Sequence, residues 1–202
     1  MLDAEFFRRW LTDAAGLVDR EAGRLTELDS AIGDADHGAN LQRGFAAVTQ
    51  VLADEAPATP GAVLVTAGKA LISKVGGASG PLYGTLLRRT GKALGDAAEV
   101  TPGEFAAALG AGVAAVAALG GAKAGDKTML DALEPAVAAL GDSTDTFAAA
   151  RDAAERGALD TVPLLARKGR ASYLGERSIG HEDPGAASSA LLLAALAGAV
   201  RR

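Results

Sequence analysis

The sequence predicts an all-α protein, with about eight helices in one domain that spans residues 1–202. Alanine supplies 48 of the 202 residues, whereas isoleucine occurs three times and aromatic residues make up 4%. Because alanine is the strongest helix former and β-branched and aromatic residues favour strands, this composition favours helices packed through small side chains. Apolar residues also recur at three- and four-residue spacing, which is typical of helices with one buried face. A chain of this length can bury one large core.

Four helices are expected in the first half of the chain. The first one starts near the N-terminus and fades near Arg24, before the polar run 29–40. A second helix is predicted over 39–53, a third over 60–75 and a fourth over 82–97. The apolar face of the first helix is formed by Phe6, Phe7, Trp10, Ala14, Leu17 and Val18.

Four more helices are expected in the second half, and no strand is predicted. The fifth runs to about residue 119. The sixth covers 128–140, where Pro135 kinks or shortens it. The seventh begins near residue 145 and continues, bent at Pro163, to about residue 168. The last helix reaches residue 200.

Three helix starts carry clear signals. Thr59-Pro60 and Asp183-Pro184 each place an N-cap residue before a proline, which is favoured in the first helical turn. The segment 101–104, Thr-Pro-Gly-Glu, forms a capping box, in which the threonine and glutamate side chains each accept a backbone N–H.

Composition and charge exclude several classes of protein. The net charge is −5 and the pI is about 5.1, which argues against a nucleic-acid-binding surface. The absence of cysteine excludes disulfides, zinc–thiolate sites, iron–sulfur clusters and cysteine catalysis. The uncharged stretches 105–122 and 185–200 are expected to be buried helices rather than membrane spans, and the N-terminus lacks the apolar core of a signal peptide. A cytoplasmic protein is therefore expected.

Four interhelical loops hold much of the glycine and both histidines. They lie at 26–40, 76–81, 120–128 and 175–185. Successive members of this set are two helices apart, and alternate loops of an antiparallel bundle share one end. All four are therefore expected to gather at the same end of the bundle.

Three carboxylates fall within eight residues, at Asp29, Asp34 and Asp36. Carboxylate oxygens suit hard cations such as Mg²⁺ or Ca²⁺. An EF-hand is excluded, because Ala39 stands where that loop needs glycine and Phe45 where it needs glutamate. Since Mg²⁺ often completes its shell with substrate phosphates, the cluster indicates one or two Mg²⁺ ions held against a nucleotide. The alternative is a solvated, aspartate-rich turn.

The remaining loops carry weaker signals. The glycine-rich run 76–81 could approach a phosphate with its backbone N–H groups, or could be only a tight turn. The run 121–128 is not a P-loop, because Asp126 separates Gly125 from Lys127. Lys127, like Lys123, is expected to be an ordinary surface charge. His37 and His181 both lie in glycine-bearing loops, which makes a functional role as plausible as a structural one.

Together, four motifs resemble those of the ADP-binding L subunits of dihydroxyacetone kinases, the DhaL family. They are LDSAIGDADHGAN (28–40), GGASGPLYGT (76–85), GAKAGDKTMLDAL (121–133) and ASYLGERSIGHEDPGA (171–186). The resemblance covers almost the whole chain. It implies an eight-helix antiparallel up-and-down barrel, with nucleotide and Mg²⁺ capping one end.

The resemblance also implies roles for individual residues. The Mg²⁺ ligands, for two ions, would be Asp29, Asp34 and Asp36. The ADP- or ATP-binding positions would be His37, Gly38, Ala39, Asn40, Gly77, Ala78, Ser79, Gly120, Gly121, Met129, Arg177, Asp183, Pro184 and Gly185. The family usually has GDGDHG where this chain has Ala35, and a positive φ there would disfavour alanine by about 1 kcal/mol.

As a family member, the chain would be a kinase subunit that positions Mg²⁺-nucleotide and forms no covalent intermediate. The phosphoryl acceptor would be dihydroxyacetone, held by a histidine of a separate K subunit. Bound ADP would be rephosphorylated by a phosphohistidine protein, the M subunit of a phosphotransferase system, or replaced by ATP. Homodimerisation stays open. The basic residues Arg167, Lys168, Arg170 and Arg177 are either a docking site for a partner or a solvated surface.

Two alternatives remain. The partner subunit could present another small ketose or a fatty acid, because the substrate belongs to the partner. The chain could instead be a nucleotide-dependent regulatory module that contacts a transcription factor. Retention of all three aspartates favours the enzyme, and a purely structural bundle would not explain four polar, glycine-rich loops.

Overall fold

Helices dominate the structure, a computed structural model that describes residues 1–200. The all-α prediction is confirmed. In chain order the elements are β1 (Leu2–Asp3), α1 (Ala4–Ile32), α2 (His37–Glu55), α3 (Pro60–Lys74), α4 (Ser79–Leu94), β2 (Glu99–Val100), α5 (Pro102–Gly120), α6 (Leu130–Ala139), α7 (Thr146–Leu159), the 3₁₀ helix η1 (Arg170–Ser178) and α8 (Pro184–Ala199).

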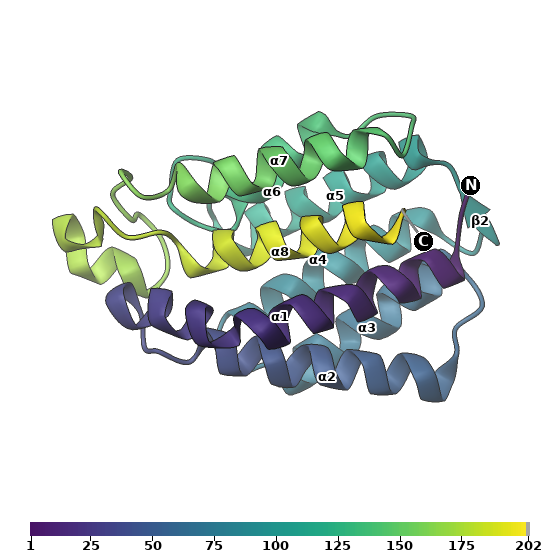
Figure 1. Ribbon diagram of the computed structural model, residues 1–202, viewed down its shortest axis with the longest axis horizontal. Helices are drawn as coiled ribbons and strands as arrows, with labels where there is room; N and C mark the ends of the chain where they lie inside the picture. The colour runs from purple at the N-terminus through teal and green to yellow at the C-terminus, as the bar shows by residue number, and fades with distance from the viewer. Residues whose placement is uncertain (201–202) are drawn as a thin grey trace.

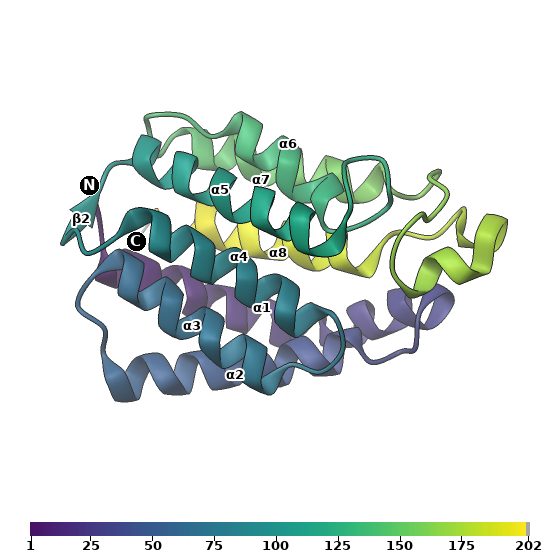
Figure 2. The ribbon, with the colours of Figure 1, turned by 180° about the vertical axis from the view of Figure 1, so that it is seen from behind.

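The helices form a closed antiparallel ring. Each α-helix packs against the next one in the chain, and α8 returns to pack against α1 (Figure 1). Because the helices alternate in direction, their connections collect at two opposite ends. One end carries both termini and β2, and the other carries η1 and the long connections around it (Figures 1 and 2). The up-and-down arrangement expected from the resemblance is therefore present.

The two ends are built from different side chains. At the end with the termini, called here the aromatic end, five rings pack against one another: Phe6, Phe7, Trp10, Phe105 and Phe147. The opposite end, called here the loop end, is formed by residues 33–36, 75–78, 121–129 and 160–183. The predicted loops therefore gather at one end.

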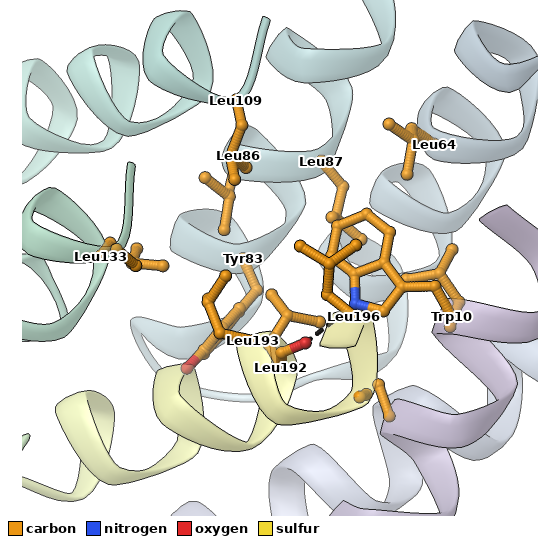
Figure 3. Close-up of a cluster of buried hydrophobic side chains, with 14 of the residues drawn as sticks. Trp10, Leu64, Tyr83, Leu86, Leu87, Leu109, Leu133, Leu192, Leu193 and Leu196 are labelled. Atoms are coloured by element: carbon orange, nitrogen blue, oxygen red, sulfur yellow. Dashed lines mark hydrogen bonds between the residues drawn. The ribbon is translucent and has the colours of Figure 1, made fainter. Parts of the chain in front are cut away.

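The core between these ends is continuous and largely aliphatic. Helix α8 has no polar face and packs against α1, α6 and α7. Trp10 of α1 is fully buried, and its indole Nε1 donates a hydrogen bond to the Leu192 carbonyl oxygen at 2.9 Å (Figure 3). This bond satisfies the one polar atom of the tryptophan side chain.

Small residues let α3 and α4 approach closely, as the composition predicted. A Cβ atom at Gly84 would lie 2.7 Å from the Gly68 carbonyl oxygen, and one at Gly68 would lie 2.7 Å from that of Gly84. Glycine is therefore required on both helices where they cross. Among residues 1–200, α5 alone is long and apolar enough to cross a membrane, a property that core helices share.

The predicted end of the first helix was wrong. Helix α1 continues to Ile32 instead of fading near Arg24. Its buried face passes from Val18 through Leu25 and Asp29 to Ile32, at spacings of seven, four and three residues. The helical period thus runs through a segment whose exposed residues are polar, and it carries Asp29 into the last turn.

The fourth helix begins earlier than predicted, at Ser79, and ends at Leu94. Pro81 lies in its first turn, where a missing N–H costs nothing. The paired strands were also missed. Leu2 pairs with Val100 and Asp3 with Glu99, and two-residue strands are too short to show a period in sequence.

The seventh helix ends at Leu159 and does not continue to residue 168. Thr161, Val162 and Leu164 each donate an N–H to the carbonyl three residues earlier, so the chain tightens into successive turns around Pro163. The helix η1 that follows was not predicted. Helix α6 is shorter than expected, with Pro135 inside it.

Candidate functional site

A cavity of about 490 Å³ opens at the loop end of the bundle. Its walls come from the end of α1, the starts of α2, α4, α6 and α8, the end of α5, and the beginning of η1. Every loop that the sequence singled out contributes to it. The prediction that these loops lie together is confirmed.

Three carboxylates converge on one side of this cavity. Oxygen atoms of Asp29, Asp34 and Asp36 all lie within 4.8 Å of one another. Asp29 is buried, and its Oδ2 accepts the backbone N–H groups of Asp36 at 2.9 Å and His37 at 3.1 Å. Asp29 therefore shapes the loop that presents the two exposed carboxylates. This donor set fits a hard cation such as Mg²⁺.

Ala35 lies between the two exposed aspartates with φ of +63°. This is the left-handed region, in which a Cβ atom is disfavoured. Position 35 therefore does have the positive φ that would favour the glycine of GDGDHG, and this chain has a strained alanine there. The loop still closes, because Asp29 holds both sides of the turn.

Arg170 reaches the aspartate cluster from η1. Its Nη2 lies 2.9 Å from Asp34 Oδ2, and the two side chains are 69% and 38% exposed. An ion pair this exposed contributes little stability. Its importance is its position, because it places a guanidinium at the edge of the cavity. The sequence suggested Arg170 only as part of a docking stretch, since 136 residues separate it from Asp34.

His37 connects three helices through hydrogen bonds. Its Nδ1 lies 3.1 Å from Ser79 Oγ, at the start of α4, and its Nε2 lies 2.9 Å from Ser188 Oγ on α8. Burial lowers the pKa of His37, and the negative charges of Asp29 and Asp36 oppose this shift. The imidazole is therefore mostly neutral at pH 7, and both of its nitrogens are engaged.

The same network continues to Tyr83. Its hydroxyl oxygen lies 2.6 Å from Ser188 Oγ and 2.9 Å from Ser189 Oγ. The Gly185 carbonyl oxygen, at 3.2 Å, is an acceptor for the same hydroxyl. Burial raises the pKa of Tyr83 to about 12. Tyr83 and Ser188 escaped sequence analysis, because neither stands in a recognisable spacing with His37.

The start of α4 offers free backbone donors to the cavity. Its N-cap is Ala78, and within residues 1–200 no side chain caps the first turn. Gly77, with φ of +66°, turns the chain into the helix, and Gly77, Ala78 and Ser79 all line the cavity. An uncapped helix N-terminus favours an anion such as a phosphate.

The start of α8 is capped by a buried carboxylate. Asp183 Oδ2 accepts the N–H of Ala186 at 2.8 Å, and the Asp183 N–H donates to Thr161 Oγ1 at 2.9 Å. Burial raises the pKa of Asp183 to about 7, although the hydrogen bond from Ala186 opposes this shift. Asp183 thus gains a proton within the neutral range.

Much of the remaining wall is apolar, although Lys127, Thr128 and Lys168 also line it. The apolar lining residues come from α4, α5, α6 and the connection before α6, and they include Leu82, Val116, Leu119, Ala122, Met129 and Leu130. The cavity therefore combines carboxylates and a free helix N-terminus with a surface suited to a flat, weakly polar group.

The prediction that Lys127 is a surface charge was wrong. Its side chain is fully buried, and its Nζ donates to backbone carbonyl oxygens of the connection that follows α7. These carbonyls are more than 30 residues away in sequence, so no local pattern indicated the burial. Lys123 is exposed, as expected.

Most of the predicted site residues line the cavity, although some do not. Those in the lining are Asp29, Asp34, Asp36, His37, Gly77, Ala78, Ser79, Gly120, Met129, Asp183, Pro184 and Gly185. Within the described chain, the lining does not include Gly38, Ala39, Asn40, Gly121 or Arg177. Gly38 has a packing role instead, because a Cβ there would overlap the Ala22 carbonyl oxygen of α1. Asn40 lies against the turn at Gly76.

Comparison with known proteins gives this geometry a context. Residues 31–198 match the DAK2 domain family. A Listeria innocua protein named PEP-dependent dihydroxyacetone kinase 2, ADP-binding subunit DhaL, is 44% identical over 201 residues, which cover 96% of this chain and 93% of the relative. The Escherichia coli protein named PEP-dependent dihydroxyacetone kinase, ADP-binding subunit DhaL, is 43% identical over 195 residues, which cover 93% of each chain.

A solved structure shares the fold. The crystal structure of the dihydroxyacetone kinase from C. freundii in complex with AMP-PNP and Mg²⁺ matches with a TM-score of 0.77 and 26% identity, over 96% of this chain and 34% of that one. This chain therefore spans about a third of the C. freundii kinase and nearly the full length of the two DhaL relatives. From the family match, the identities and the shared fold, the chain belongs to the DAK2 domain family.

Proposed function

We propose that this chain is the nucleotide-binding, phosphoryl-transfer subunit of a dihydroxyacetone kinase. One observation carries the proposal: three carboxylates and an uncapped helix N-terminus face the same partly apolar cavity. This is the set of groups that a nucleotide with Mg²⁺ requires. The high-coverage relatives named ADP-binding subunits, and the C. freundii kinase solved with AMP-PNP and Mg²⁺, support the same function.

The chemistry of the cavity suggests how the nucleotide lies. The phosphates would meet the backbone N–H groups of residues 77–79, and the base would lie against Leu82, Val116 and Met129. Asp29, Asp34 and Asp36 would hold one or two Mg²⁺ ions, which neutralise phosphate charge during transfer. The Asp29 carboxylate already bonds two backbone N–H groups, so its remaining oxygen is the one available to a metal.

The chain's own residues position the nucleotide and form no covalent bond with the substrate. His37 is buried with both nitrogens hydrogen-bonded, and the chain has no cysteine. The acceptor dihydroxyacetone would be held by a separate K subunit that docks at the loop end, in keeping with relatives that are named as ADP-binding subunits. The PEP-dependent relatives favour rephosphorylation of bound ADP by a phosphohistidine M subunit in the cytoplasm.

Reconstitution tests this function. The purified chain would be mixed with a K subunit, dihydroxyacetone, and either ATP or a PEP-charged phosphohistidine protein. We expect dihydroxyacetone phosphate only when this chain and Mg²⁺ are present, and no product with Asp36→Asn. The donor that supports turnover separates the two branches. Nucleotide-dependent binding to the K subunit without product under either donor would contradict the proposal and favour a regulatory module.

A further inference from the structure

Lys127 is a buried cation surrounded by backbone carbonyl groups. Its side chain is 1% exposed. The Nζ atom lies near four backbone carbonyl oxygens: 2.8 Å from that of Ser178, 2.9 Å from that of Thr161, 3.1 Å from that of Leu164 and 3.4 Å from that of Val162. An ammonium group has three N–H donors, so the three short contacts use all of them.

The carbonyls belong to a segment with little regular structure. Between the end of α7 and the start of α8, only η1 is helical. Two backbone N–H groups also join these stretches: that of Gly180 donates to the Val162 carbonyl oxygen at 2.8 Å, and that of Ala166 donates to Ser178 Oγ at 3.0 Å. The Arg167 N–H donates to the Asp126 carbonyl oxygen at 3.0 Å and ties the segment to the loop before α6. The Gly180 and Ala166 bonds join the same two stretches that Lys127 joins. Lys127 therefore lies at the point where the segment folds back on itself.

The same segment forms one wall of the cavity. Residues 168–171 and 183–185 line it. In the chain, 168–171 lie between the two stretches whose carbonyls Lys127 contacts, and 183–185 follow the second stretch. Asp183 is further tied to Thr161 by its backbone N–H. A shift of residues 161–164 relative to residue 178 would thus move both parts of the wall.

The backbone at Lys127 is strained, which points to a specific need for the side chain. Its φ is +62°, in the region that glycine adopts readily and lysine does not. Gly125, two residues earlier, has φ of +87°, so the loop does use glycine where no side chain is needed. Burial also lowers the pKa of Lys127, and the negative charge of Asp183 opposes that shift.

We propose that Lys127 is a positioning residue for the nucleotide cavity: its ammonium holds residues 161–164 against residue 178, and thereby fixes the wall formed by 168–171 and 183–185. The part of this inference that concerns nucleotide rests on the proposed function. The part that concerns the wall does not. Neither glutamine, with two N–H donors, nor methionine, with none, can make all three short hydrogen bonds of the ammonium.

Two variants and a matched control test this role. Lys127→Met leaves the carbonyls without a donor, and Lys127→Gln restores part of the bonding. Phe147→Leu, at the aromatic end, lowers stability without touching the segment. For each protein we would measure thermal unfolding, the dissociation constant for ADP with Mg²⁺ by calorimetry, and tryptic cleavage without nucleotide. The segment carries its own trypsin sites, at Arg167, Lys168, Arg170 and Arg177.

The expected result is a graded, local effect. Lys127→Met should weaken ADP binding at least about tenfold. The displaced wall would lose contacts with ADP, and the binding free energy of those contacts corresponds to about that factor. The ADP affinity of Lys127→Gln should lie between those of Lys127→Met and wild type. Trypsin should cleave both variants within 167–177 faster than it cleaves wild type. Phe147→Leu should bind ADP within about twofold of wild type.

Two outcomes would overturn the inference. The first is ADP affinity and cleavage within 167–177 that stay at the wild-type level in both Lys127 variants. The second is a loss of ADP affinity in Phe147→Leu that equals the loss in the Lys127 variants, at the same decrease in melting temperature. If Lys127→Met does not fold, Lys127→Gln alone decides by the same criteria. If wild type does not bind ADP, the proposed function fails, while the cleavage rates still decide whether Lys127 holds the wall.

Discussion

The two ends of this bundle are stabilised by different interactions. At the aromatic end, the rings pack edge to face or tilted, with centroid distances of 5.3 to 6.2 Å. Nearly all of the buried polar residues among 1–200 lie at or near the loop end: Asp29, His37, Asn40, Asp126, Lys127, Thr161, Ser178, Asp183, Ser188 and Ser189. One end therefore depends on apolar burial, and the other on hydrogen bonds that must all be made.

Because of this difference, the aromatic end mainly stabilises the fold and the loop end mainly carries the groups that bind a ligand. Apolar packing is insensitive to charge and pH, so the aromatic end can hold the helices together whatever the cavity contains. The loop end exposes carboxylates and free N–H groups to the cavity, and it keeps a strained alanine and a buried cation. A site for a charged ligand requires such groups, and their cost is offset elsewhere in the fold.

The largest expected effect is a stability loss confined to the aromatic end. Phe105→Ala removes a fully buried ring that contacts Phe7, Trp10 and Phe147. We expect the free energy of unfolding to fall by about 3–5 kcal/mol, because the transfer and cavity terms add. Urea unfolding measures the loss. ADP affinity should be unchanged in the folded protein, and a tenfold weakening would break the separation of the two ends.

A smaller loss is expected from the buried network at the loop end. Tyr83→Phe removes a hydroxyl that Ser188 and Ser189 both contact, and so leaves buried serine hydroxyls short of a partner. The unfolding free energy should fall by up to about 3 kcal/mol. Tyr173→Phe is the matched control, because Tyr173 is 88% exposed, and it should be neutral. Equal effects in the two variants would show that the network adds no stability.

The loop end should also respond to pH through Asp183. Its native pKa is about 7, against an ordinary value of 3.8, because of burial. As pH falls below 7, the native state binds a proton that the unfolded state does not, so this group adds stability toward lower pH. Asp183→Asn keeps a capping oxygen but cannot titrate.

Urea unfolding of the nucleotide-free proteins at pH 8 and pH 5 measures this effect. The stability of Asp183→Asn relative to wild type should decrease by about 2 kcal/mol from pH 8 to pH 5. A difference that stays constant between the two pH values would mean that Asp183 is ionised throughout.

The smallest predicted effects compare two strained alanines, one at each end. Ala35 has φ of +63° beside the carboxylates, and Ala56 has φ of +42° after α2, at the aromatic end. Glycine at either position should raise the unfolding free energy by about 1 kcal/mol. Only Ala35→Gly should change Mg²⁺-dependent ADP binding, as measured by calorimetry. A change with Ala56→Gly would show that the ends are coupled.

The sequence predicted what depends on neighbouring residues. The caps at Thr59, Thr101 and Asp183 accept the backbone N–H groups expected of them. The gathering of the loops followed from counting helices, and the aspartate cluster followed from spacing. The residue-by-residue assignments to nucleotide remain predictions, although most of those residues line the cavity.

What the sequence could not predict depends on distant partners. Lys127 is buried because carbonyls more than 30 residues away surround it, and Arg170 meets Asp34 only after the ring closes. The true end of α1 was missed because polar residues outnumber apolar ones there, although the buried face continues to Ile32. Local polarity suggested a loop, and tertiary packing favoured a helix.

Native mass spectrometry with and without EDTA tests the central claim most directly. Wild type, Asp34→Ala and the control Asp96→Ala, an exposed aspartate after α4, would each be mixed with ADP and Mg²⁺. The loop end as a metal–nucleotide site predicts a complex of protein, ADP and Mg²⁺ in wild type and Asp96→Ala. That complex should be lost with EDTA and in Asp34→Ala, because a missing metal ligand costs more than the 10- to 100-fold of a supporting residue. Wild-type protein that binds neither ADP nor ATP in the presence of Mg²⁺ would contradict the claim.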